Sequence, residues 1–145
     1  MVHERLFPSF WMAGFECSSQ IHYRGRGRLD YTAELEHDRR CDADYALLAQ
    51  FGIRTVRDGI RWHLIERRPG RFDFSSVEPL MRAARKHGLL VIWDICHYGW
   101  PDDVDPLRPD FPDRYARLAR AWAQYVNDNS DGVPFYAPVN EISFL

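Results

Sequence analysis

The chain has 145 residues, of which 46% are hydrophobic and 28% are charged, and its net charge is −2. This length and balance are ordinary for one compact domain that buries its own core. Lysine and arginine do not gather into one stripe, so the composition gives no reason to expect a nucleic-acid partner. The basic run from Arg24 to Arg28 is short and glycine-rich, which is typical of a solvated loop.

Cysteine usage and the N-terminus indicate the compartment. The three cysteines are odd in number and contain no Cys-x-x-Cys pair, so neither a disulfide framework nor a zinc ribbon is expected. The N-terminal residues contain no long apolar stretch, and we expect neither a signal peptide nor a transmembrane segment. The sequence therefore predicts a cytoplasmic protein with no membrane partner.

The first two predicted elements are a strand and a helix. The apolar run from Phe10 to Glu16 predicts the strand. A polar, glycine-rich loop separates it from a helix over residues 42–52, in which apolar residues recur at helical spacing. Asp42 or Asp44 is expected to cap the start of this helix, and Gly52 is expected to end it.

The middle of the chain predicts a strand, a helix and a strand. Ile53 to Gly59 is rich in β-branched residues, as strands are. We expect Ser76 to cap the next helix, because that register places Pro79 in the first turn, where a missing N–H costs nothing. Gly88 is expected to end this helix. Leu89 to Ile95 is almost entirely apolar, which is typical of a parallel strand covered by helices.

The last two elements complete an alternating pattern. Pro112 to Asp128 carries one apolar stripe and predicts a helix packed on a sheet, and Val133 to Asn140 predicts a strand. Among the tryptophans, we expect Trp11, Trp93 and Trp122 in the core. The order βαβαβαβ fits two α/β architectures: a small doubly wound sheet, or the first (βα)4 half of a TIM (β/α)8 barrel.

The residues after the strands favour the half-barrel. A nucleotide-binding sheet would have a glycine-rich phosphate turn after its first strand, and residues 17–30 contain none. Polar side chains stand instead at the C-terminal end of every predicted strand: Glu16 and Gln20, Arg57 and Asp58, Asp94 and His97, Asn140 and Glu141. In α/β barrels this end carries the active site.

Several motifs in chain order carry a resemblance to a known family. They are CSSQIH, RDGIRW, RRPGRFDFSSVEPLMRAARKHGLLVI, CHYGWP and PVNE. Together they resemble the (β/α)8 glycosidases of glycoside hydrolase clan A, most closely family 1, the β-glucosidase-like enzymes. The resemblance spans almost all of residues 1–145 and implies the N-terminal half of a glycosidase barrel domain.

Three positions depart from the family pattern. The family's histidine is usually followed directly by tryptophan, whereas Tyr98 and Gly99 stand between His97 and Trp100 here. Ile142 replaces the usual proline after the Asn-Glu pair, and Glu16 stands where small residues are common.

The resemblance implies retaining hydrolysis of β-glycosidic bonds and assigns roles to residues. Glu141 would protonate the leaving oxygen and later act as the base, and Asn140 would bond the sugar 2-hydroxyl. Arg57 would lie beside the nucleophile and hold it ionised; the structural alternative is an ion pair of Arg57 with Asp58 or Asp94. Glu141 follows an apolar run, so we expect it in apolar surroundings.

Three further residues are candidates for carbohydrate binding. By the resemblance His97 would donate to a sugar hydroxyl, Gln20 would bind the sugar through its amide, and Trp100 could stack on a sugar face. No cofactor is implied. A metal site is not expected either, because the spacing of Asp94, His97, Asp102 and Asp103 contains no HExxH or other compact ligand set.

A retaining glycosidase also needs a second carboxylate as nucleophile. In the family this nucleophile lies on the seventh strand of the barrel, whereas this sequence predicts only four strands. Three interpretations stay open: part of a longer glycosidase, two half-barrels that pair by self-association or with a second chain, and a noncatalytic domain that binds a carbohydrate or a protein. We expect little or no hydrolysis by these 145 residues alone.

Overall fold

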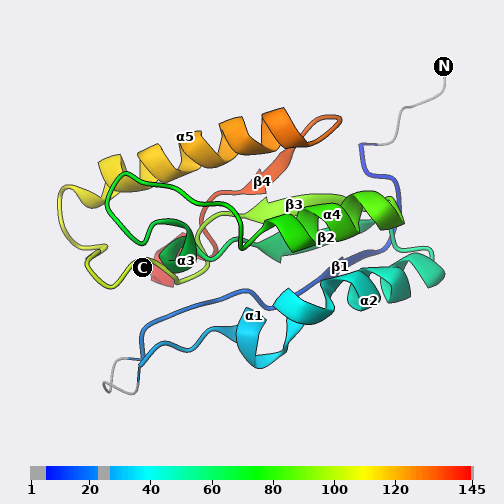
Figure 1. Ribbon diagram of the computed structural model, residues 1–145, viewed down its shortest axis with the longest axis horizontal. Helices are drawn as coiled ribbons and strands as arrows, with labels where there is room; N and C mark the ends of the chain where they lie inside the picture. The colour runs from blue at the N-terminus through cyan, green and yellow to red at the C-terminus, as the bar shows by residue number, and fades with distance from the viewer. Residues whose placement is uncertain (1–5, 23–26, 145) are drawn as a thin grey trace.

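The computed structural model describes residues 6–22 and 27–144 (Figure 1). The four strands are β1 (Met12–Gly14), β2 (Thr55–Gly59), β3 (Leu90–Asp94) and β4 (Phe135–Ala137). The helices are α1 (Tyr31–Glu34), α2 (His37–Gln50), α3 (Trp62–Ile65), α4 (Glu78–His87) and α5 (Phe111–Asn129), followed by the 3-10 turn η1 (Ile142–Phe144). All four predicted strands and all three predicted helices are present. The short helices α1 and α3 were not predicted, because four residues carry too little periodicity.

The strands form one parallel sheet in the order β1-β2-β3-β4. A doubly wound sheet would reverse its strand order at a switch point, so the sequential order excludes that alternative. Right-handed crossovers between sequential neighbours place the connecting helices on one face of the sheet. Figure 1 shows the strands side by side with α2, α4 and α5 running along them. The fold is the first (βα)4 half of a TIM barrel, as predicted.

The two faces of the sheet differ in burial. Because strand side chains alternate, Val56, Asp58, Val91 and Trp93 share the helix-covered face, and all four are buried. The Trp93 ring meets Trp122 of α5 edge to face, with centroids 5.2 Å apart. The opposite face is only partly covered and includes Met12, Arg57, Leu90, Ile92, Phe135 and Ala137. That face corresponds to the interior of a closed barrel.

Helix α2 begins five residues before the first of the two predicted caps. Glu36, in the left-handed region with φ of 58°, precedes it without a side-chain cap, and Asp42 and Asp44 lie inside the helix. The prediction was wrong because the buried face starts at His37 and continues through Cys41 and Tyr45 at four-residue intervals. His37, where this buried face begins, does not read as apolar in a simple hydrophobic pattern. The predicted end is confirmed: Gly52 follows with φ of 72°.

Helix α4 has a different start from the predicted one. Val77 is the N-cap and makes no side-chain capping bond, while Ser76 Oγ is buried and has no hydrogen-bond partner among the described residues. Asp73 organises the preceding turn instead, because its carboxylate accepts a hydrogen bond from the Ser75 N–H at 2.9 Å. Pro79 does lie in the free first turn, as predicted. Gly88 ends the helix in the left-handed region, also as predicted.

The core between the sheet and the helices combines aliphatic residues with several large aromatic ones. Trp93 and Trp122 are buried as predicted, and Trp62, which contacts Phe111 and Tyr115, is fully buried in the same core. Trp11 is 73% exposed, so its predicted place in the core was wrong. It directly precedes β1, an edge strand, and its ring contacts the exposed Phe10. No helix within residues 6–22 and 27–144 is both long and apolar enough to cross a membrane.

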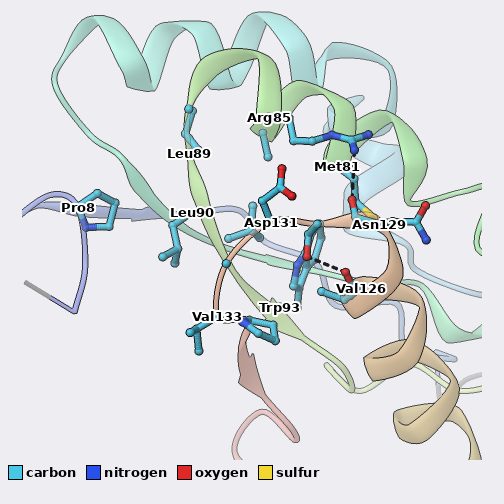
Figure 2. Close-up of a pocket in the computed structure, with 16 residues that line it drawn as sticks. Pro8, Met81, Arg85, Leu89, Leu90, Trp93, Val126, Asn129, Asp131 and Val133 are labelled. Carbon is cyan, nitrogen blue, oxygen red and sulfur yellow. Dashed lines mark hydrogen bonds between the residues drawn. The ribbon is translucent and has the colours of Figure 1, made fainter.

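A cavity of about 330 Å³ opens where β3 and β4 begin (Figure 2). Met81 and Arg85 of α4, Trp93 of β3, and Val126 and Asn129 of α5 line it. This is the N-terminal end of the strands, opposite to the end where the predicted site residues stand. In α/β barrels residues at that end contribute to stability, whereas the active site lies at the C-terminal end of the strands.

Candidate active site

Arg57 joins three strands at their C-terminal ends. Its guanidinium projects from β2, bonds the Asp94 carboxylate at the end of β3, and donates to Asn140 Oδ1 after β4 at 2.5 Å. The Asn140 N–H donates to the Cys96 carbonyl at 2.9 Å, which fixes the loop after β4 to the loop after β3. Arg57 therefore pairs with Asp94 and also contacts a predicted sugar-binding residue. Asp58, the other proposed partner, lies on the opposite face of the sheet.

His97 lies beside this network and faces the end of β1. Its Nδ1 is 3.2 Å from Cys17 Sγ and 3.4 Å from Asp94 Oδ2. Its Nε2 lies 3.7 Å from Glu16 Oε1. The ring is mostly buried, whereas the Glu16 side chain is 45% exposed. Residues from β1 and β3 thus form one polar cluster at the sheet end.

Two glycines allow the residues after β1 to approach the sheet closely. A Cβ on Gly59 would lie 2.7 Å from the Cys17 Cβ and would overlap its sulfur. A Cβ on Gly99 would overlap the Ser19 hydroxyl. The Ser19 N–H donates to the His97 carbonyl at 3.3 Å, which holds the two loops together. The close approach places Cys17 Sγ 3.2 Å from Nδ1 of His97.

Burial and charge set the ionisation of this cluster. Burial raises the pKa of Asp94, and the Arg57 guanidinium offsets only part of that effect. Burial also raises the pKa of the Cys17 thiol, and the carboxylates nearby raise it further. Partial burial would raise the pKa of Glu16, but the Ser18 N–H and the charges of His97 and Arg57 lower it below its usual value. Glu16 is therefore an ionised carboxylate at the rim.

Tyr98 and Glu141 make a second contact across the same rim. The Tyr98 hydroxyl donates to Glu141 Oε2, and this bond raises the pKa of the phenol. Both residues have positive φ angles, 55° and 43°, which side chains of L-residues rarely adopt. Such strain is common at functional sites. Glu141 is nevertheless exposed, so the predicted apolar surroundings are not present. Strand β4 ends at Ala137, four residues earlier, which leaves Glu141 beyond the packed sheet.

Gln20 and Trp100 lie outside this network. Gln20 is exposed, and its backbone carbonyl accepts a hydrogen bond from the Leu29 N–H. The Trp100 ring is half-buried and packs edge-on against Phe111, 6.3 Å between centroids. The structure thus brings together Arg57, His97, Asn140 and Glu141 of the six candidate residues.

The acidic residues considered with His97 for a metal site separate in space. Asp102 pairs with Arg28, and Asp103 pairs with Arg114. Asp94 stays beside His97, where Cys17 completes a group of three potential ligands within the described residues. One feature of the sequence could have indicated that Cys17 belongs to this group. Cys17 directly follows Glu16, which is one of the departures from the family pattern.

Comparisons with known proteins give matches only in structure. No model of a known protein family matches this chain, and no curated protein matches it. Among solved structures, the exo-β-1,4-mannosidase Op5Man5 from Opitutaceae bacterium strain TAV5 is 20% identical with a TM-score of 0.65. The alignment covers 92% of this chain and 25% of that enzyme.

Two further solved structures are β-glycosidases. A family 1 β-glucosidase from Thermotoga maritima is 17% identical with a TM-score of 0.64, over 73% of this chain and 25% of that enzyme. The β-glycosidase BGL167 is 24% identical with a TM-score of 0.60, over 70% of this chain and 26% of that one. The chain thus spans about a quarter of these enzymes, and over that part it shares their TIM-barrel fold.

Proposed function

We propose that this chain is the acid/base half of a retaining β-glycosidase barrel most similar to family 1. The observation that carries the proposal is the Arg57 guanidinium, which joins Asp94 and Asn140 beside Glu141 at the C-terminal end of the sheet. The arrangement suits a sugar ring held over the strand ends. The three free, buried cysteines fit a reducing compartment such as the cytoplasm.

Each proposed role follows from the chemistry of glycoside hydrolysis. Glu141 is the general acid that protonates the leaving oxygen and then the base that activates water. Asn140, oriented by Arg57, offers its amide N–H to the sugar 2-hydroxyl, since its Oδ1 already accepts from the guanidinium. His97 contacts another hydroxyl, and Gln20 and Trp100 contribute at the periphery if their loops close on the sugar.

We infer that the second carboxylate comes from outside these 145 residues, because the family that the chain resembles carries it on the seventh strand. A retaining site places its two carboxyl groups about 5 Å apart on opposite sides of the scissile bond. The remaining strands of the barrel, in the same polypeptide or in a second half-barrel, would supply the nucleophile. We therefore propose that the chain alone binds a sugar at the Arg57 site without hydrolysing it.

Titration of the isotope-labelled chain with methyl β-glucoside, followed by NMR, tests this proposal. We expect weak saturable binding with shifts at His97, Asn140 and Glu141, and at least about a tenfold loss of affinity for Asn140→Ala, since a lost sugar hydrogen bond costs on the order of 1.5 kcal/mol. The matched control is Asn129→Ala at the opposite end of the sheet, which should bind normally.

Two results would contradict the proposal. The first is a set of shifts that maps to the cavity in Figure 2 and persists in the Asn140 variant. The second is robust turnover of aryl β-glycosides that Glu141→Gln abolishes, because a complete active site would then exist in this chain.

A noncatalytic interaction domain is the alternative function. It is favoured by the incompletely covered barrel-interior face and by the exposed side chains of Phe10, Trp11 and Met12 beside and within the edge strand β1. Such a surface suits a second half-barrel or a second copy of this chain.

A further inference from the structure

Three different metal-ligating side chains converge beneath the candidate active site. Cys17 Sγ, Asp94 Oδ2 and His97 Nδ1 all lie within 4.8 Å of one another. The sulfur is 3.2 Å from the imidazole nitrogen and 3.9 Å from the carboxylate oxygen, and the nitrogen and oxygen are 3.4 Å apart. We propose that these three residues form a zinc-binding site, which does not depend on the glycosidase proposal.

The separations of the donor atoms match a tetrahedral site. Zinc–ligand bonds of about 2.0 to 2.3 Å at tetrahedral angles place neighbouring donors about 3.3 to 3.8 Å apart. Each observed separation lies within about 0.4 Å of that range. Small side-chain rotations would therefore bring the three donors into bonding positions around one ion.

The surroundings of the donors also suit a metal. Asp94 and Cys17 are 0% and 2% exposed, and Asp94 Oδ1 is buried with no hydrogen-bond partner among the described residues. Arg57 donates to Asp94 Oδ2, the same oxygen that faces Cys17 and His97, so a bound ion would share this oxygen with the guanidinium. Metal-bound histidine usually gives its second N–H to a carboxylate, and Glu16 stands 3.7 Å from His97 Nε2.

The charges balance when a divalent ion is bound. The Cys17 thiolate, Asp94 and Glu16 carry three negative charges, and Arg57 carries one positive charge. Zn²⁺ neutralises the two negative charges that remain. On binding, the Cys17 S–H bond breaks, a sulfur–zinc bond forms, and the proton leaves to solvent, so the affinity should fall as the pH falls.

The donor types select the kind of ion. Magnesium and calcium prefer oxygen ligands, whereas a thiolate with an imidazole and a carboxylate is typical of zinc. Three protein ligands leave a fourth position open for water, as in catalytic rather than structural zinc sites. The proposed site therefore holds an exchangeable ion next to the sugar-binding rim.

Titration of the untagged, metal-free chain with Co²⁺ tests the proposal, because a cobalt–thiolate bond produces a charge-transfer absorption band. We expect this band to saturate at one equivalent and to disappear when Zn²⁺ is added. Cys17→Ser should abolish the band, and His97→Gln should weaken Co²⁺ binding at least about tenfold, since each removes one ligand. Cys41→Ser, which alters a buried cysteine on α2, is the control and should leave the titration unchanged.

Circular dichroism of each metal-free variant checks that it is folded before it is titrated. His97 is partly exposed, so its substitution tests the site even where a change at buried Cys17 disturbs folding. The proposal is overturned if the folded chain shows no band at one equivalent, if the band survives in Cys17→Ser, or if His97→Gln binds Co²⁺ as tightly as the original chain.

Discussion

His37 is the centre of a buried charge cluster on the helix-covered side of the sheet. Its Nδ1 lies 2.7 Å from Asp44 Oδ2 and its Nε2 lies 2.8 Å from Asp58 Oδ2. The Tyr45 hydroxyl donates to the same Asp58 oxygen at 2.6 Å, and the Phe15 ring stacks on the imidazole with centroids 3.8 Å apart. The cluster links α2 to the residue next to Arg57, so it positions the strand that carries the candidate site.

The stability of the fold should depend on the protonation of His37. Burial alone would lower its pKa, but the hydrogen bonds and charges of Asp58 and Asp44 outweigh burial and raise it. A raised pKa means that the native state holds the proton more tightly than the unfolded state. The stabilisation is therefore complete below about pH 6.5, the unfolded value, and is lost as the pH rises through the native value.

We predict that His37→Gln lowers the free energy of unfolding by about 3 to 5 kcal/mol under acidic conditions, because it leaves Asp58 buried without its cation. The difference from the original chain should shrink as the pH rises above about 6.5 and through the raised native pKa of His37. Urea unfolding at a series of pH values measures it. Asp44→Asn, which removes one partner and keeps the Tyr45–Asp58 bond, should show a smaller pH dependence. A difference that is constant with pH would contradict the prediction.

The sequence revealed some of these residues and not others. Arg57, Asn140 and Glu141 were found because they follow apolar strands, and parallel strands bring such positions to one end of a sheet. Cys17 was not found. It can approach the sheet only because Gly59 has no side chain, and this contact joins residues that are far apart in the chain. The Tyr98–Glu141 bond depends on two positive φ angles, which composition and periodicity do not encode.

The C-terminal end of strand β2 leaves space for the loop that follows β1. Gly59 ends the strand with a φ that any residue can adopt, so its role is space rather than backbone freedom. Gly14 of β1 offers a matched comparison, since a Cβ there would meet Arg57 only at ordinary contact distances of 3.7 and 3.9 Å.

Gly59→Ala should lower the free energy of unfolding by about 1 to 3 kcal/mol, because the new methyl group overlaps Cys17 and must push the loop outward. Gly14→Ala should be neutral or slightly stabilising. Chemical denaturation of the two variants measures the contrast. Equal effects of the two substitutions would show that the close approach of Cys17 to Gly59 contributes little.

The type of an element, helix or strand, was predictable where the hydrophobic pattern extends over many residues. The residue at which an element begins was not. Helix α5 fits its apolar stripe to within one residue at each end. The starts of α2 and α4 were missed for opposite reasons. Buried polar residues extend α2 backwards, whereas the Asp73 turn replaces a serine cap before α4. Both depend on tertiary contacts that a local pattern does not contain.

Within residues 6–22 and 27–144, the molecule is a sheet with one helix-covered face and two unpaired edges. Helices α2, α4 and α5 cover one face, and the N-terminal segment lies over part of the other, where the Phe7 ring is 5.0 Å from Phe135 and Ser9 Oγ donates to Thr55 Oγ1 at 3.4 Å. In a closed barrel β1 and β4 would each pair with a further strand. Unpaired edges beside exposed apolar side chains favour association.

We therefore predict that the purified chain self-associates in a concentration-dependent way through the β1 edge. Met12 is 46% exposed on this strand, with Trp11 and Phe10 beside it. Met12→Lys should shift the chain towards the monomer, because a charge on an edge strand opposes pairing at low cost to the monomer.

Leu47→Lys is the matched control, since Leu47 is 53% exposed on α2, away from the sheet edge. Size-exclusion chromatography with light scattering over a range of concentrations measures the mass. A monomer at every concentration would mean that the open face is tolerated in water, and an equal effect of both substitutions would place the contact elsewhere.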